Sequence, residues 1–572
     1  LTIIFLFDSS YNKGLAMYLG LDVGGTHTDT VIIGNSGVIA KSKIATTHDN
    51  LLSCITDSFS AVLANVDPSQ IQRVNLSTTL TTNAIIQNKC EKVGMFVSGG
   101  PGIHPASYSI GNFYYIIDGQ IDHRGTEITL LNLKQLDKAI KKCKKKGIKV
   151  YAVISKFSTR NPEHEQLIAQ KLGDVDFISV GHKISGNLNF PRRIATAYYN
   201  TAVWRLYNSF SYAVAESLRA WGVTAPVNIL KADGGTIPLH ISQTMPVESI
   251  LSGPAASVIG TMALCNITED AVMLDIGGTT CDIALFADGA PLIEKDGICI
   301  DDRNTLVRSL KTKSIGIGGD SVIKINGTTV TTGPERLGMS MAEGGNNPTI
   351  IDALNVLKTI NFMDTSRSME GLLALGKKYR LSVDDIANAA ITYAMDVIYN
   401  AVMAMIEEVN ARPVYTIYEF LQGKVIKPKT IYLIGGPAKT LSNIIARRFG
   451  LNVKVPQHCQ VANAIGAAVA RTTVEIELFA DTQRCRLLIP NLEVNTRIPA
   501  GYTLDNAIDD AKNYMIQYLT TLGVDEKERE IEIVDTYSFN MVKGFETVGK
   551  NIRVRCQVKP GILHQCKDIL QI

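Results

Sequence analysis

Hydrophobic residues follow two kinds of pattern along this chain. Short apolar runs end in glycine-rich turns, and between them lie stretches with apolar residues at helical spacing. Runs and helical stretches alternate, which predicts an α/β fold with helices layered on sheets. The expected strands and strand–turn elements are 74–87, 93–100, 148–154, 227–235, 314–325 and 429–450. The expected helices are 50–63, 131–146, one from Pro162, 190–220, 249–260, 383–410 and 461–470.

The pattern changes from about Ala480 onward. Strand-like runs at 487–492, 530–534, 538–543 and 551–558 surround a helical stretch at 503–522. None of these runs ends in the glycine turns found earlier in the chain. This part is therefore expected to form a separate small α/β domain that serves as a lid or an assembly surface.

One short segment occurs twice. The sequence LGLDVGGTHTDTVII covers 19–33, and MLDIGGTTCDIALF covers 273–286. Each copy is an apolar run, a glycine turn with hydroxyls and carboxylates, and a second apolar run, which is typical of a β-hairpin with a polar tip. Two such tips facing each other across a cleft could grip a polyphosphate and its metal ion.

The residue types at the tips suit this chemistry. Glycine lets backbone N–H groups approach phosphate oxygens, and threonine adds hydroxyl donors. Carboxylates repel phosphate, so Asp22 and Asp275 are expected to bind Mg2+ through its retained waters. Asp29 or Asp282 would orient the attacking group, and the repeat does not choose between them. The expected phosphate contacts are Gly24, Gly25, Thr26, Thr28, Gly277, Gly278, Thr279 and Thr280.

A third element suits a nucleoside. Gly435 and Gly436 follow an apolar strand and open a helix, so a flat base or ribose could rest on bare backbone there. Thr79 and Asn83 are candidates for phosphate or substrate contacts, with helix capping as the alternative. His27 lies within the first tip and could contact phosphate or substrate.

Composition narrows the class of protein. The chain has 572 residues, enough for three or four domains, with 45% hydrophobic and 19% charged residues and a net charge of +3. This charge predicts neither nucleic-acid nor membrane binding, and no apolar run reaches the roughly 18 to 20 residues that cross a bilayer. The ten cysteines contain no C-x-x-C pair, which favours a reducing cytoplasm. Cys281 lies inside the second tip, where a nucleophilic role competes with simple substitution of a polar residue.

In series, these motifs resemble the hydantoinase/oxoprolinase family, of the ATP-dependent hydantoinase A type, within the actin/sugar-kinase/Hsp70 ATPase superfamily. The residues that carry the resemblance are DVGGTHTD (22–29), STTLTTNAI (77–85), ILSGPAASVIG (250–260), LDIGGTTCDIAL (274–285), SIGIGGDSV (314–322), LIGGPA (433–438) and ANAIGAAVA (462–470).

The resemblance implies two RNase H-like domains that close on ATP and Mg2+, at 17–186 and 187–478. It also implies a small C-terminal α/β domain at 479–572, and residues 1–16 are expected to be a leader outside the fold. The segments 77–83 and 463–470 would be helices that couple domain closure to the nucleotide. Gly318 and Gly319 would lie near the substrate.

Family members open five-membered cyclic amides such as 5-oxoproline or hydantoins at the expense of ATP, and others are subunits of ATP-dependent ketone carboxylases. The resemblance therefore implies a cyclic amidohydrolase that works with a separate hydantoinase B-type subunit in an oligomer. A ketone carboxylase subunit and a regulatory or assembly ATPase remain alternatives. Relatives commonly read Gly-Gly-Gly-Ser where this chain has Gly318-Gly319-Asp320-Ser321, a difference that concerns the organic substrate more than ATP.

Overall fold

The computed structural model describes residues 5–6, 17–34, 37–46, 51–294, 297–411 and 425–563. Within these ranges the expected helices form, with small shifts at their ends. The bounds of all helices in these ranges, of which α5, α7, α9 and α10 were not predicted, are α1 (Leu51–Leu63), α2 (Leu80–Ile86), α3 (Leu133–Lys145), α4 (Glu163–Leu172), α5 (Gly181–Ile184), α6 (Phe190–Ala220), α7 (Leu239–Ser242), α8 (Ser252–Leu264), α9 (Ile350–Val356), α10 (Thr365–Tyr379), α11 (Val383–Asn410), α13 (Ala438–Phe449), α14 (Ala462–Val469) and α15 (Leu504–Thr521).

The first sheet contains the first repeat. Its order is β1 (Phe5–Leu6), β4 (Gly37–Ala45), β3 (His27–Gly34), β2 (Met17–Val23), β5 (Ile71–Thr78), β12 (Val227–Leu230) and β13 (Thr236–Pro238). Strands β2 and β3 form the expected antiparallel hairpin, and β5 and β12 add in parallel beside β2. The strand β1 belongs to the stretch expected as a leader; it pairs with β4, and the rest of that stretch lies outside the described residues.

The second sheet contains the second repeat in the same arrangement. Its order is β16 (Ala290–Pro291), β15 (Cys281–Ala287), β14 (Ala271–Ile276), β24 (Thr430–Ile434) and β25 (Asn452–Lys454), with β21 (Thr312–Ile315) also paired to β15. Strands β14 and β15 form an antiparallel hairpin, and β24 and β25 add in parallel beside β14. The two halves therefore repeat a strand order as well as a motif.

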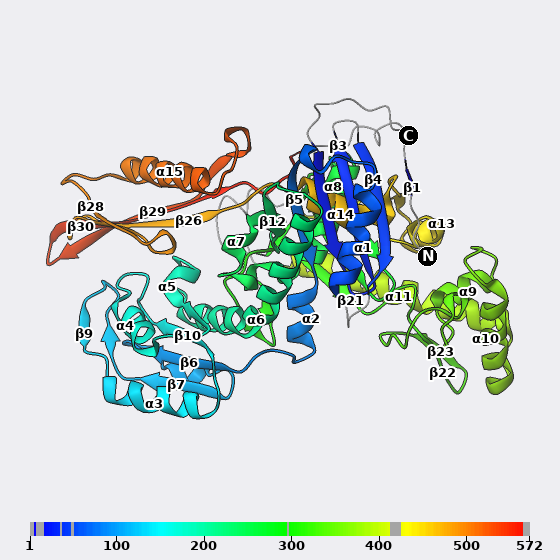
Figure 1. The fold of residues 1–572 in the computed structure, drawn as a ribbon, viewed down its shortest axis with the longest axis horizontal. Coiled ribbons are helices and arrows are strands. Elements are labelled where there is room, and N and C mark those ends of the chain that lie inside the picture. Colours follow the sequence, from blue (N-terminus) through cyan, green and yellow to red (C-terminus); the bar gives the residue numbers. More distant parts are fainter. Residues whose placement is uncertain are drawn as a thin grey trace.

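Helices α8 and α14 lie between the two sheets (Figure 1). They are rich in Ala, Gly and Ser, so their backbones approach closely. A Cβ on Gly260 would lie 2.0 Å from the carbonyl oxygen of Ala462, and one on Gly466 would lie 2.1 Å from that of Ala256. These small residues let one helix pair serve as the shared layer of both sheets.

A four-stranded parallel sheet forms a lobe between α2 and α6. Its order is β11 (Phe177–Val180), β10 (Val150–Ser155), β6 (Val93–Ser98) and β7 (Phe113–Ile117). Helices α3 and α4 cover one face, while α6 packs on the other and continues to α1 of the first sheet. The expected boundary at 186/187 does not match the first sheet, because β12 and β13 come after it and pair with β5 and with each other.

Residues 314–325 were expected to form one strand–turn–strand element. The structure separates its halves: β21 joins the second sheet, whereas β22 (Ile323–Asn326) pairs with β23 (Thr329–Thr332). With α9 and α10, the β22–β23 hairpin belongs to an insertion that projects from one end of the molecule (Figure 1).

The C-terminal domain is a five-stranded sheet covered on one face by α15. Its order is β28 (Val494–Arg497), β27 (Arg486–Ile489), β26 (Glu475–Asp481), β30 (Glu546–Val558) and β29 (Ile531–Lys543). The runs expected as separate strands at 530–534 and 538–543 are one strand with a register shift between Ile533 and Asp535. The expected domain boundary at 479 falls inside β26, whose pairing with β30 places it in this sheet.

Within the described ranges, α11 is the one helix that is long and apolar enough to cross a membrane by length and composition. The sequence predicted this helix but not a membrane span, because polar residues interrupt its apolar run. Its inward positions, including Ile386, Ala390 and Ile398, belong to the core cluster formed with the second sheet. This packing is that of a core helix in a folded domain.

Candidate nucleotide site

The two repeat tips have the same local geometry. The backbone N–H of Gly24 donates to the carbonyl of His27 at 3.0 Å, and that of Gly277 donates to the carbonyl of Thr280 at 2.9 Å. In each hairpin the two aspartates are direct cross-strand partners, Asp22 with Asp29 and Asp275 with Asp282. The duplicated sequence therefore specifies a duplicated turn.

The two tips meet although they are far apart in sequence. The Oγ1 atoms of Thr26 and Thr279 lie 3.1 Å apart and share a hydrogen bond. A Cβ built on Gly278 would lie 3.6 Å from the Cγ2 atom of Thr26. The convergence that the repeat suggested is thus present in the fold.

The four aspartates of the hairpins form one buried acidic group. Burial, the neighbouring Asp29 and Asp275 together raise the pKa of Asp22 to about 7. Burial and Asp275 raise the pKa of Asp282 to about 7. Burial also raises the pKa values of Asp29 and Asp275. Desolvated carboxylates this close together favour either protons or a bound cation.

Lys43 is a site residue that the sequence analysis missed. Its Nζ atom donates to both carboxylate oxygens of Asp29, at 2.9 and 2.7 Å, and to the carbonyl of Gln460 at 3.2 Å. Lys43 is the cross-strand partner of Asp29 on β4. The alternation in β4 was visible in the sequence, but its register against β3 was not.

Asp275 is held by the interdomain helices. Its Oδ2 atom accepts a 2.7 Å hydrogen bond from Ser257 of α8, and Ser257 also lies 3.1 Å from the Oδ1 atom of Asn463 in α14. Movement of α8 relative to α14 would therefore disturb this carboxylate directly.

The acidic group suits a hydrated cation better than a closed metal cage. Among the described residues, no three His, Cys, Asp or Glu side chains converge closely enough to hold a metal ion. The Oδ1 atoms of Asp22 and Asp282 are buried and have no hydrogen-bond partner in the described structure. Mg2+ commonly keeps several waters and takes only one or two carboxylates, so these oxygens fit such an ion.

The turn at Gly318–Ser321 packs directly on the second tip. The N–H groups of Gly319 and Asp320 donate to the carbonyls of Gly277 and Gly278 at 2.9 and 2.7 Å. A Cβ on Gly318 would lie 2.5 Å from the carbonyl oxygen of Gly278, which requires glycine there. Gly318 and Gly319 are therefore placed against the tip.

Asp320 forms an ion pair with Arg336 at 3.1 Å. Burial, only partly offset by Arg336, raises the pKa of Asp320 to about 6. The same guanidinium lies close enough to His27 to lower the pKa of that imidazole, which burial, Lys43 and Arg336 together bring to about 4. His27 is therefore neutral near pH 7 and offers phosphate no positive charge.

Gly435 and Gly436 lie beside the second hairpin. A Cβ on Gly435 would lie 2.1 Å from the carbonyl oxygen of Ile276 and 2.8 Å from the Oδ1 atom of Asp275, and its φ of +99° also favours glycine. A Cβ on Gly436 would meet nothing within 4 Å. The pair thus combines a tight contact with the hairpin and an open patch of backbone.

Thr28 and Thr280 are placed differently. Thr28 is fully buried in β3 and shares a 3.0 Å hydrogen bond with Thr46, whose hydroxyl donates to the carbonyl of Gly24. This geometry gives the Thr28 hydroxyl a role in bracing the first turn instead of the phosphate contact expected for it. Thr280 stays half-buried at the second tip.

Thr79 and Asn83 connect α2 to the first hairpin. Thr79 stands at the N-cap of α2 but makes no side-chain cap hydrogen bond. Its hydroxyl donates to the carbonyl of Val23 at 3.3 Å, and the Asn83 amide donates to that hydroxyl at 3.3 Å. The capping alternative therefore does not describe Thr79.

Cys281 opens β15 and is fully buried. Burial holds the pKa of its thiol well above the ordinary value, with Asp282 and Asp275 adding to the shift. A buried, protonated thiol is a weak nucleophile, which favours substitution of a polar residue over a catalytic role.

Comparison with known proteins decides the family. The model of the hydantoinase/oxoprolinase N-terminal region matches residues 18–175, and that of hydantoinase/oxoprolinase matches residues 193–476. The chain belongs to the hydantoinase/oxoprolinase family. This confirms the resemblance to this family that the motifs carry.

Relatives of this chain carry the names of different enzymes. The chain is 25% identical over 59% of its length to the caprolactamase subunit alpha of Pseudomonas jessenii, and 22% identical over 70% of its length to the 5-oxoprolinase of Saccharomyces cerevisiae. These matches cover 53% and 31% of the two relatives, so the chain spans about half the length of the first and less of the second.

A solved structure confirms the fold. A nucleotide-free structure of acetone carboxylase matches with a TM-score of 0.74 at 17% identity, covering 97% of this chain and 89% of that one. The mixed α/β architecture is therefore shared.

The contact between the tips can be tested by cross-linking. With the two Oγ1 atoms 3.1 Å apart, Thr26→Cys combined with Thr279→Cys is expected to form a disulfide under mild oxidation. Mass spectrometry of proteolytic peptides should find the 26–279 cross-link and its loss on reduction. Each single variant is the control and should give no such peptide. Absence of the cross-link in the double variant would show that the tips do not meet.

The acidic group should make stability depend on pH. The folded pKa of Asp282, about 7, lies above the ordinary 3.8, so between these values the native state holds a proton that the unfolded chain releases. The contribution of Asp282 to the stability of the nucleotide-free, metal-free protein should therefore fall as pH rises from 4 to 7, whereas His27, with its lowered pKa, contributes in the opposite direction. Asp282→Asn should reduce the fall in Tm between pH 5 and pH 8 by a few degrees, whereas Asp137→Asn in α3 should leave it unchanged. An undiminished fall in Asp282→Asn would contradict this assignment.

Proposed function

We propose that this chain binds ATP between two RNase H-like domains, with the phosphates held by the twin hairpin tips. The observation that carries this proposal is the contact between Thr26 and Thr279. The repeated strand order around the two hairpins supports it, because equivalent strands present equivalent tips from opposite sides. Backbone N–H groups of Gly25 and Gly278 and the hydroxyls of Thr26, Thr279 and Thr280 would contact the phosphates.

Asp22 and Asp275 would hold Mg2+ through its water ligands. Their buried position and raised pKa values support this role, since a divalent ion stabilises the ionised form of each carboxylate. The ion would neutralise charge on the β- and γ-phosphates.

The structure also favours one of the two aspartates left open by the repeat. Asp29 is paired through both oxygens with Lys43 and so serves to position that cation. Asp282 has a buried Oδ1 atom without a hydrogen-bond partner in the described structure. We therefore assign orientation of the attacking oxygen to Asp282, which need act only weakly as a base in a loose transition state.

The adenosine would lie on the Gly435–Gly436 turn. The open space above Gly436 admits a flat ring, while Gly435 ties the turn to Asp275 and hence to the phosphate site. This arrangement would place base and triphosphate on a single surface of the second sheet.

The proposed reaction is ATP-dependent opening of a five-membered cyclic amide of the hydantoin or 5-oxoproline type. The amide oxygen attacks the γ-phosphate and ADP leaves, which makes the ring carbonyl carbon more electrophilic. Water then adds to that carbon, and the C–N bond breaks with protonation of nitrogen, which leaves an acyl phosphate. A second water hydrolyses the acyl phosphate to the open-chain carboxylate and free phosphate. Two relatives named for amide-opening activities, caprolactamase and 5-oxoprolinase, support this choice.

A partner subunit of the hydantoinase B type is part of the proposal. The caprolactamase relative is itself named as a subunit, and the chain spans about half of it. In this scheme the chain would activate the amide and the partner would complete ring opening, in an oligomeric assembly in the cytoplasm.

A ketone carboxylase subunit is the second candidate. The match to acetone carboxylase covers nearly the whole chain and supports it. In that reaction the same phosphate site would activate a ketone enolate or bicarbonate instead of an amide. A regulatory or assembly ATPase is a third possibility for this fold.

Removal of Asp22 tests the ATP site. Asp22→Ala should lower ATP hydrolysis by about 100-fold or more, because it removes an electrostatic group at the phosphates. Circular dichroism should be unchanged, since the variant also removes a desolvated carboxylate. Asp137→Ala, an exposed change in α3, should keep wild-type turnover. Wild-type turnover in Asp22→Ala would remove the metal assignment.

Stimulation of ADP release distinguishes the candidate reactions. With a hydantoinase B-type subunit present, 5-oxoproline or hydantoin should raise ADP release, whereas acetone with bicarbonate should not. Asp282→Asn should abolish the stimulation if this carboxylate orients the attacking oxygen. Stimulation by ketone and bicarbonate alone would establish the carboxylase alternative. ATP-dependent binding or polymerisation without any small-molecule stimulation would establish the regulatory one.

A further inference from the structure

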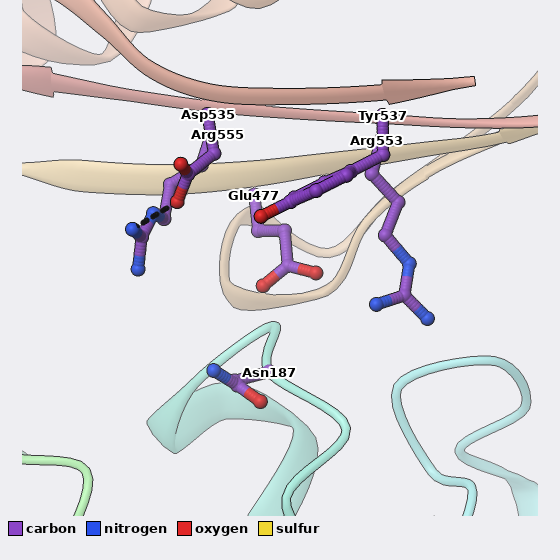
Figure 2. A pocket seen from close by; sticks show the side chains of 6 residues that line it. All are labelled: Asn187, Glu477, Asp535, Tyr537, Arg553 and Arg555. Atoms are coloured by element: carbon purple, nitrogen blue, oxygen red, sulfur yellow. Dashed lines mark hydrogen bonds and ion pairs between the residues drawn. The ribbon is translucent and has the colours of Figure 1, made fainter. Parts of the chain in front are cut away.

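A second candidate site lies between the C-terminal sheet and the lobe. A cavity of about 230 Å3 separates the polar face of this sheet from the loop that follows α5. Figure 2 shows side chains pointing into this space from β26, β29 and β30, with Asn187 facing them from the loop. Its lining residues are Asn187, Glu477, Asp535, Tyr537, Arg553 and Arg555.

Strand register explains why these side chains gather. Arg555 is paired with Asp535 on one side and Glu477 on the other, so the three form one row across the sheet. Arg553 is likewise paired with Tyr537 and Phe479, and these form the next row. Alternation along each strand places both rows on the same face, away from the core under α15.

The lining of the cavity carries two arginines and two carboxylates, so its own formal charges balance. Arg555 forms an ion pair with Asp535. Arg553 forms no hydrogen bond or ion pair with the described residues, although it lies close enough to Glu477 to oppose the rise in pKa that burial gives this carboxyl. Arg160 stacks on Phe479 at 3.3 Å from the ring centroid and adds a third cation.

Arg160 is the most buried of these cations. It is 2% exposed, and its Nη2 atom has no hydrogen-bond partner in the described structure. Both Arg553 and Glu477 interact electrostatically with it. Other nearby carboxylates are engaged elsewhere: Asp481 pairs with Arg124 at 3.4 Å and Glu475 with Arg308 at 2.7 Å. With the buried Arg160 counted behind the lining, three arginines therefore stand against two carboxylates around the cavity.

We propose that this cavity binds a small carboxylate anion, with Arg553 as its principal contact. A guanidinium presents two parallel N–H donors that match the two oxygens of a carboxylate. The side-chain oxygen of Asn187 accepts from the N–H of Asn189 at 3.0 Å, which leaves the amide NH2 as a further donor at the opposite wall. One negative charge balances the local excess, whereas a phosphate dianion would add repulsion from Glu477 and Asp535.

This site is separate from the proposed ATP site. Its walls are the C-terminal sheet and the 185–189 loop, whereas the hairpin tips belong to the first and second sheets. Binding can therefore be measured without ATP, and its outcome does not depend on whether the chain hydrolyses ATP.

The experiment is isothermal titration of the full chain with sodium acetate, with sodium chloride of equal ionic strength as background. Wild-type protein should give saturable binding of acetate. Arg553→Met should weaken it about tenfold or more, and Arg553→Lys should be intermediate because it keeps the charge but loses the paired donors. Glu477→Gln should tighten binding several-fold by removing a nearby negative charge. Arg497→Met, an exposed change on β28, is the matched control and should bind like wild type.

Several results would overturn the proposal. These are no saturable acetate binding by wild-type protein, unchanged affinity in Arg553→Met, weaker binding in Glu477→Gln, or tighter binding of sodium phosphate than of acetate. A purely structural role for these residues would not produce tighter binding in Glu477→Gln. If Arg553→Met fails to fold, Arg553→Lys and Glu477→Gln decide the question, because each keeps the size of the side chain nearly constant.

Discussion

Backbone contact between α8 and α14 is the constraint on which the candidate site depends. Gly260 and Gly466 let the two helices touch main chain to main chain, and Gly20 of β2 lets the carbonyl of Ala464 approach the first sheet as closely. A side chain at any of these positions would push the two sheets apart. The hairpin tips meet only because each sheet packs on the same thin helical layer, and Ser257 links that layer to Asp275.

The site holds several charged side chains close together in a buried place, where water does not screen them. Its hairpins contribute four carboxylates, and one lysine, Lys43, forms a direct ion pair with them, through Asp29. Burial then raises the pKa values of all four acids. Such an arrangement costs stability in the free protein, and a cation bound beside the carboxylates would offset that cost. The proposed cation binding would thus be coupled to folding through the same carboxylates.

The parts that differ between the two halves are inserted around this shared centre. The lobe of β6, β7, β10 and β11 enters the first half after α2, and the insertion with α9 and α10 enters the second half after β21. Each leaves the hairpin and its neighbouring strands intact. The polar face of the C-terminal sheet contacts the lobe through the ion pair of Asp481 with Arg124, two residues that are far apart in the sequence. The second cavity lies between the same sheet and the lobe.

The sequence alone determined the local features: alternating apolar runs, the helix at 383–410, and both glycine turns with their aspartates. These follow from short-range sterics and periodicity, which a single chain segment contains. Tertiary structure decided the rest. Strand register places Lys43 opposite Asp29, and an inserted loop brings Arg336 into an ion pair with Asp320. The side chain of Thr28 is buried and hydrogen-bonds with Thr46. Such pairings depend on which distant elements pack together, and no local pattern encodes that choice.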